Sequence, residues 1–170
     1  MIGEPWSTSN VEWLIFSTQV ISGSGNFIYV SDERMGRDLV VRSSSQPDEH
    51  ARSTFLVETE SSGLIRIRSA RGEPYYLFCS SDEIDDNGKR KLVEATTDTS
   101  DDRTLFKIRA MGPSFQYAFQ CVATGTYIRV KQETSGGNYH VIHDSTDPPQ
   151  VFMCFEMLEG DTPAAEKRSA

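Results

Sequence analysis

The stretch 104–130, TLFKIRAMGPSFQYAFQCVATGTYIRV, contains three β-strand patterns separated by two turn signals. Over 104–109, apolar residues alternate with Lys and Arg, so one face of a strand there would be apolar. A Gly-Pro pair then interrupts the pattern, because Gly tolerates positive φ and Pro has no N–H to give a ladder. Strands over 117–123 and 127–130 follow, joined by a Thr-Gly-Thr turn. Three strands with such short connections predict antiparallel β-structure.

The same order of parts occurs in the rest of the chain, which divides into three units. The predicted strands are 11–17, 26–30, 38–42 and 54–59 in the first unit, 64–69, 75–79, 91–95 and 104–109 in the second, and 117–123, 127–130, 139–143 and 151–158 in the third. The last strand of each unit opens with a polar residue before an apolar core: STFLVE, RTLFKI and QVFMCF. Phe55 and Phe106 are 51 residues apart (106 − 55), and Phe106 and Phe152 are 46 apart (152 − 106). A period of this length indicates a repeated supersecondary unit.

Twelve strands in three four-stranded units resemble the β-trefoil superfamily over 11–158. The resemblance implies an all-β fold in which six strands form a short barrel and six form hairpins that cap one end, with three pseudo-symmetric repeats. We expect one domain over 11–160, a lead-in over 1–10, and a flexible tail over 161–170, which is polar and lacks a core pattern. The predicted core residues are Trp13, Ile15, Phe27, Phe55, Val57, Ile65, Ile67, Leu77, Phe106, Ile108, Phe119, Cys121, Ile128, Phe152 and Phe155.

Charge and composition exclude several classes of partner. The 170 residues carry a formal net charge of −8, which argues against nucleic-acid binding and against an anionic membrane surface. No apolar run approaches the length of a membrane span, and no basic segment followed by an apolar run marks a signal peptide. We therefore expect a protein that is cytoplasmic or released without a signal peptide. The three cysteines lie in apolar strand patterns, which predicts small buried residues in place of a disulfide framework.

Motifs of individual β-trefoil families are weak or missing. Ricin-type lectin units end in Gln-x-Trp, but the matching places read Phe-Leu-Val, Phe-Lys-Ile and Phe-Met-Cys. The basic heparin patch of growth factors is inconsistent with the net charge. The segment 63–77 (GLIRIRSARGEPYYL) is similar to fascin-type repeats, with low specificity. A protein-binding β-trefoil, such as a protease inhibitor, cytokine-like ligand or fascin-like cytoskeletal binder, is thus one alternative, because the loops over 43–53, 80–90 and 131–138 are long and diverse.

Signatures of catalysis and of metal or cofactor binding are missing from the sequence. The acidic loop that begins at Asp82 lacks the ligand spacing of an EF-hand. His140 and His143 lie three apart on a predicted strand, so they would face opposite sides and could not share one ion there. Neither a G-x-S-x-G motif nor a Gly-rich phosphate loop before a helix is present. We therefore predict that the protein is not an enzyme and has no metal site and no cofactor.

Aromatic residues beside polar loops predict carbohydrate binding. Each unit has a tyrosine in its second strand with polar residues on the following loop, the combination that lets an aromatic face contact a sugar while polar groups take its hydroxyls. We predict a non-enzymatic lectin at shallow surface sites, with glycans or glycoproteins as partners and a protein target such as a protease as the alternative. The third unit is the favoured site, and the ring of Tyr127 is expected near the surface. The predicted site residues are Tyr127, Arg129, Asn138, Tyr139, His140, Asp144, Tyr75, Asp82, Tyr29 and Asp32.

Overall fold

The computed structural model describes residues 11–17, 26–46, 50–60, 62–83, 90–112, 116–131, 139–147 and 151–157. It contains twelve strands, all within the ranges that the sequence predicts or extending them by a few residues. They are β1 (Glu12–Ser17), β2 (Asn26–Met35), β3 (Asp38–Ser44), β4 (Phe55–Thr59), β5 (Ile65–Ser69), β6 (Tyr76–Glu83), β7 (Lys91–Thr96), β8 (Phe106–Gly112), β9 (Gln116–Cys121), β10 (Tyr127–Val130), β11 (Tyr139–Ser145) and β12 (Phe152–Met157). A single-turn 3-10 helix, η2 (Asp102–Thr104), precedes β8.

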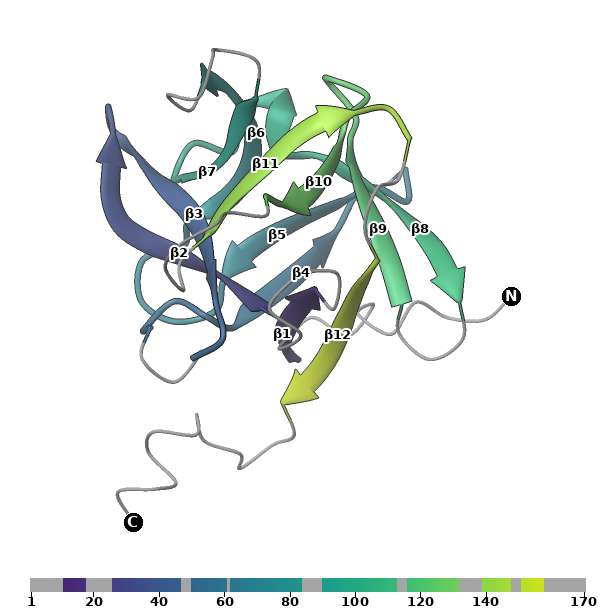
Figure 1. Cartoon of the computed structure of the whole chain (residues 1–170), viewed down its shortest axis with the longest axis horizontal. Coiled ribbons are helices and arrows are strands. Elements are labelled where there is room, and N and C mark those ends of the chain that lie inside the picture. Colours follow the sequence, from purple (N-terminus) through teal and green to yellow (C-terminus); the bar gives the residue numbers. More distant parts are fainter. Residues whose placement is uncertain are drawn as a thin grey trace.

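Six of the strands close into a barrel. Each of β1, β4, β5, β8, β9 and β12 pairs antiparallel with the next in that order, and β12 returns to β1. A closed ring has no free edge in the described strands, so every barrel strand has a hydrogen-bonded neighbour on each side. The first and last strands of the chain meet here, and β1 and β12 lie side by side in Figure 1.

The other six strands form three hairpins that cap the barrel. Hairpins β2–β3, β6–β7 and β10–β11 lie together at one end of the molecule (Figure 1), and β3, β7 and β11 pair with one another in a triangle. The register repeats around this triangle: Val40 pairs with Glu94, Leu92 with Ile142, and His140 with Arg42. A six-stranded barrel capped by three hairpins with threefold register is the β-trefoil, so the predicted fold is confirmed.

The core fills the barrel and the inner face of the cap. Strand alternation buries one face of each strand, as in β1 and β5, where every second residue is buried. Twelve of the predicted core residues that the structure describes are buried; Phe27 and Ile108 are only partly buried, and the side chain of Phe155 lies outside the described residues. Phe27 was assigned to the wrong face, because Ile28 and Val30 point into the core and Phe27 packs on Phe16, with ring centroids 4.7 Å apart.

Two hairpins extend further than the hydrophobic pattern predicts. β2 and β6 continue through the polar residues after Val30 and Cys79, where the register of each hairpin shifts. After the shift, Arg34 pairs with Leu39, and Gly36 closes the first hairpin with a φ of 65°, which favours glycine. The sequence predicted loops for these residues because they lack the apolar alternation of a strand that faces the core. A hairpin arm that projects into solvent needs no apolar side chains, so the strands continue without that pattern.

Two predictions from composition can be checked against the described residues. Cys79, Cys121 and Cys154 are free and buried, as predicted. Within the described ranges, no helix is long and apolar enough to cross a membrane. The predicted lead-in over 1–10 and tail over 161–170 lie outside those ranges.

Candidate functional site

A pocket of about 370 Å³ opens between the middle of β2 and the segment that precedes β4. A backbone hydrogen bond of 3.0 Å from Val30 N to Arg52 O holds the two segments together. The volume falls in the range of small-ligand sites, roughly 300–1,000 Å³. The lining residues are Tyr29, Val30, Ser31, Asp32, His50, Ala51 and Arg52.

Two stacked rings form the aromatic wall of the pocket. The rings of Tyr29 and His50 have centroids 3.6 Å apart and planes inclined by 11°. Tyr29 is 5% exposed and His50 is half-buried, so His50 supplies most of the aromatic surface that a ligand can reach. Burial raises the pKa of the Tyr29 hydroxyl, against the opposing effect of Arg42, and the group therefore stays protonated at neutral pH.

Arg52 ties the pocket to the backbone of β2. Its Nε donates to the carbonyl of Val30 at 3.2 Å, and its Nη2 donates to the carbonyl of Ser31 at 3.0 Å. The same Nη2 forms an ion pair with Asp32. A planar guanidinium that satisfies two carbonyls and a carboxylate holds the pocket wall in one geometry.

The carboxylate of Asp32 is the polar group most open to a ligand. Its side chain is 96% exposed, whereas that of Arg52 is 22% exposed. The hydroxyl of Ser31 already donates to the carbonyl of Val40 at 2.6 Å and accepts from Glu33 N at 3.2 Å. The pocket therefore offers an anionic acceptor at its rim and a fixed cation behind it.

A predicted site residue of the second unit lies beside this pocket. The Arg52 guanidinium carbon is 5.6 Å from the centroid of the Tyr75 ring, a cation–π contact. The structure thus brings together three residues that the sequence assigned to two separate sites: Tyr29, Asp32 and Tyr75. Tyr75 is 9% exposed, so it supports Arg52 and offers little ring surface of its own.

The third unit does not have the exposed rings that the sequence predicted. Tyr127 is 5% exposed and Tyr139 is 9% exposed, and Tyr139 belongs to the main hydrophobic core. The expectation that the ring of Tyr127 lies near the surface was wrong, and Tyr139 is buried as well, because each opens a strand whose first residue faces inward. His140 is half-buried, and Asn138 lies outside the described residues.

The remaining two predicted residues of the third unit form an ion pair with each other. Arg129 Nε and Nη2 donate to the two carboxylate oxygens of Asp144 at 2.9 and 2.8 Å. This bidentate pair lowers the pKa of Asp144 and raises that of Arg129. A ligand would have to compete with the internal pair for either group, which makes this surface a poorer binding site than the first-unit pocket.

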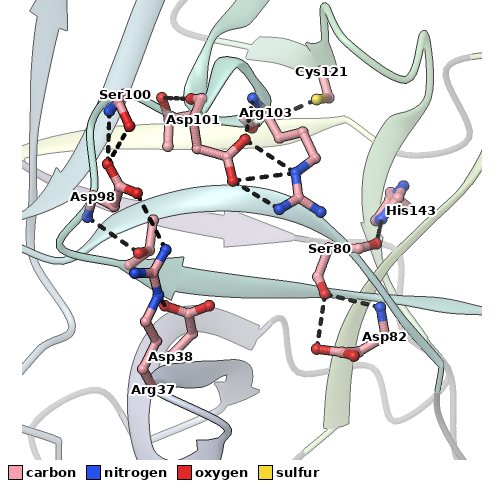
Figure 2. Close-up of polar contacts among 12 residues, drawn as sticks. Arg37, Asp38, Ser80, Asp82, Asp98, Ser100, Asp101, Arg103, Cys121 and His143 are labelled. Carbon is pink, nitrogen blue, oxygen red and sulfur yellow. Dashed lines mark hydrogen bonds and ion pairs between the residues drawn. The ribbon is translucent and has the colours of Figure 1, made fainter.

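The second unit has a different arrangement at the positions equivalent to the pocket. Arg103 and Arg52 each lie three residues before the first phenylalanine of the next barrel strand, so Asp101 matches His50. Figure 2 shows Arg103 against the Asp101 carboxylate: Nε donates to its two oxygens at 3.0 and 3.2 Å, and Nη2 donates to one of them at 2.7 Å. The Arg103 guanidinium carbon then lies 5.0 Å from the centroid of Phe78, the counterpart of Tyr29. Where the first unit has an accessible aromatic wall, the second has a ring covered by its own arginine.

Asp82, the last predicted site residue, lies at the end of β6 and apart from the pocket. Its backbone N and its carboxylate contact the Ser80 hydroxyl at 2.9 and 3.1 Å (Figure 2). The carbonyl of Ser80 accepts from His143 Nε2 at 2.7 Å. Among the described residues, no group of three or more His, Cys, Asp or Glu side chains could hold a metal ion.

Sequence reasoning missed His50 and Arg52, two of the seven residues that line the pocket. Both lie in a polar segment with no strand pattern, and no local motif marks them. One signal was available: ARSTF and DDRTLF place an arginine at the same distance before the phenylalanine of two units. A repeated polar residue outside the core pattern indicates a shared structural position, although it does not show which residue the arginine contacts.

Comparison with known proteins supports the fold and nothing narrower. No protein-family model matches the chain, and no curated protein sequence matches it. A Caenorhabditis elegans protein of unknown function has a similar structure, with a TM-score of 0.69 and 13% identity over 91% of this chain and 98% of that one. The designed threefold-symmetric protein ThreeFoil aligns with a TM-score of 0.63 and 14% identity over 84% of this chain and 96% of its own.

Part of a larger toxin is also similar. A mosquitocidal holotoxin aligns with a TM-score of 0.64 and 14% identity over 86% of this chain, but this chain spans only 17% of the holotoxin's length. Identities this low establish a shared architecture without a shared function.

Proposed function

We propose that this chain is a non-enzymatic carbohydrate-binding β-trefoil protein whose sugar site is the first-unit pocket. The observation that carries the proposal is the combination of an accessible His50 ring, stacked on Tyr29, with the exposed carboxylate of Asp32 at the rim. A flat ring suits the C–H face of a pyranose, and a carboxylate accepts hydrogen bonds from its hydroxyls. Arg52 positions these groups and needs no movement on binding.

The arrangement supports binding without hydrolysis. Glycoside hydrolysis generally uses two carboxyl groups that flank the scissile bond, one as the acid and one as the base or nucleophile. Asp32 is the single carboxylate among the residues that line the pocket. It is also engaged by the Arg52 guanidinium, so the described pocket lining holds no second carboxyl group to complete the pair that hydrolysis needs.

A glycan array followed by calorimetry with the best glycan tests this proposal. We expect His50→Ala to weaken binding by about fivefold, because a lost aromatic contact is worth about 1 kcal/mol. Asp32→Asn should weaken it by roughly tenfold or more, because hydrogen bonds to a charged group contribute about 1.5–3 kcal/mol.

The matched control is Asp102→Asn. Asp102 is an exposed carboxylate in the second-unit segment that corresponds to the pocket wall, so its substitution removes the same charge from the chain. Equal losses in Asp32→Asn and Asp102→Asn would indicate a general charge effect and contradict the site. If no glycan binds above background, the proposed function is rejected. If the protein is retained on a protein target and free sugar does not release it, a protein-binding β-trefoil is favoured.

A further inference from the structure

Glu94 on β7 is a carboxyl group buried without compensation. Its residue surface is 0% exposed, and its strand neighbours are Phe78 on β6 and Val40 on β3. Within the described part of the chain, neither of its carboxyl oxygens has a hydrogen-bond partner. An ionised carboxylate in such a place costs several kcal/mol or more, so a buried group of this kind needs a cation or a proton.

The first unit shows what the cation would be. The register pairs Val30 with Val41 and Tyr29 with Arg42 in hairpin β2–β3, and Cys79 with Val93 and Phe78 with Glu94 in hairpin β6–β7. Glu94 therefore occupies the position of Arg42 under the pseudo-threefold symmetry. Arg42 forms an ion pair with Glu33, with contacts of 2.8 Å from both Nε and Nη2 to Oε2.

The acidic partner persists in the second unit, but the arginine does not. Counting along β2 from Val30 and along β6 from Cys79, Asp82 is the counterpart of Glu33. A Glu94–Asp82 pair of carboxyl groups thus replaces the Arg42–Glu33 ion pair. Asp82 is exposed to solvent and Glu94 is buried, so the replacement of the arginine leaves the buried carboxyl group without a counter-charge.

The charged groups on the neighbouring elements do not supply a cation. From β3, Asp38 adds a second negative charge, and from η2, Arg103 is bound to Asp101. Lys91, at the start of β7, forms an ion pair with Glu83, with 3.7 Å between Nζ and Oε2. His143 from β11 is held neutral because burial lowers its pKa, and its Nε2 donates to Ser80 O. Burial, followed by the contact with Asp82, raises the pKa of Glu94 to about 8.

We propose that Glu94 binds a proton where the first unit has the Arg42 guanidinium, which makes hairpin β6–β7 a pH-sensitive element of the cap. At neutral pH the protonated group is uncharged and needs no cation in its buried position. When it loses the proton, its charge repels Asp82 and favours separation of the end of β6 from β7. Ser80, at that end of β6, holds the third-unit residue His143, so the loosening extends to the contact between the two hairpins.

The sign of the pH effect follows from the raised pKa. The folded chain retains a proton that the unfolded chain releases near pH 4.5, so stability declines as pH rises from that value towards about 8. Above about 8 both states are ionised and the contribution of Glu94 is constant. A stability loss that continues from pH 6 to about pH 8 distinguishes Glu94 from ordinary carboxyl groups, which titrate below pH 5.

Thermal melts between pH 6 and 9 test the proposal. The parent should lose roughly 5–10 °C in Tm over this range, whereas Glu94→Gln should lose much less and melt above the parent at pH 9. Glu58→Gln is the matched control, because Glu58 is a half-exposed carboxyl paired with Arg68, and its variant should keep the slope of the parent. Identical slopes in the parent and in Glu94→Gln would overturn the proposal.

Carbon-detected NMR of the parent, labelled at glutamate side chains, provides a second measurement that needs no variant to fold. One glutamate carboxyl should titrate above pH 7, and Asp82→Asn should lower its midpoint. If every glutamate titrates below pH 5.5, Glu94 does not hold a proton at neutral pH and the proposal fails. The proposal is independent of the sugar site, because neither experiment involves a ligand.

Discussion

The first and second units have hairpins of the same register and an arginine at the same position, yet one presents an accessible ring and the other covers its ring. In the first unit, His50 stacks on Tyr29 and Arg52 reaches across to the carbonyls of β2. In the second unit, Arg103 donates hydrogen bonds to Asp101, and its guanidinium lies over the ring of Phe78. Each guanidinium thus lies beside the aspartate that its own unit supplies, Asp32 for Arg52 and Asp101 for Arg103.

The difference illustrates how a pseudo-symmetric fold acquires a single distinctive site. The barrel requires a conserved pattern of apolar residues in all three units, since those side chains meet in one core. The polar residues around the hairpins have no such common partner, so each unit can pair them differently. A second pair of equivalent positions also differs between the units. The first unit has the Arg42–Glu33 ion pair, and the second unit has two carboxyl groups, Glu94 and Asp82.

Truncating the equivalent core phenylalanines should have the largest effect and should be the same in both units. Phe55 and Phe106 are each 0% exposed at the start of matching barrel strands. We expect Phe55→Ala and Phe106→Ala each to cost about 3–5 kcal/mol of unfolding free energy, measured by urea denaturation. Costs that differ by more than about 2 kcal/mol would show that the symmetry of the core is only geometric.

Tyr139 should behave as a core residue, in contrast to the pocket-lining Tyr29. With 9% exposure and a place in the main core, Tyr139→Ala should cost roughly 2–4 kcal/mol, seen as a lower Tm. Tyr139→Phe keeps the ring and serves as the control, with a cost below about 1 kcal/mol. If the alanine variant melts like the parent, the ring lies at the surface and the third unit becomes a candidate sugar site again.

Removing each arginine separates its structural role from its role in the pocket. We expect Arg52→Ala to cost about 2 kcal/mol, because two carbonyls lose their donors, and to abolish detectable glycan binding. Arg103→Ala should cost about 1 kcal/mol and leave binding unchanged. Calorimetry on both variants, beside denaturation curves, provides the comparison, and equal losses of binding would contradict a site confined to the first unit.

The smallest effect concerns the ion pair that covers the second-unit ring. The hydrogen bond from Arg103 lowers the pKa of Asp101, so the pair stabilises the fold above about pH 4 and the contribution is lost as pH falls through the lowered pKa. The pair is partly exposed, and we expect a contribution below about 1 kcal/mol. As pH is lowered from 6 to 2.5, the unfolding free energy should fall more steeply in the parent than in Asp101→Asn, and parallel curves would show that the pair adds nothing.

The candidate site was predictable only in part. Tyr29 and Asp32 were identified because an aromatic residue followed by a carboxylate is a local pattern on one strand. Tyr127 and Tyr139 satisfied the same pattern and are buried, because the face that a strand presents to the core depends on its register with its neighbours. His50 and Arg52 reach the site from a segment far along the chain, and no local pattern marks which strand such a segment contacts.

The sequence by itself determined the number of strands, their order, their grouping into three units and about half of the core, 12 of the 25 residues in the main cluster. These features depend on periodicity and turn residues, which act over a few positions of the chain and are therefore readable in order. Tertiary structure alone decided which tyrosines are accessible, where each arginine points and why Glu94 lacks a cation. Those outcomes depend on distances between side chains of different strands, and a small change of register or of one neighbour alters them without altering the strand pattern.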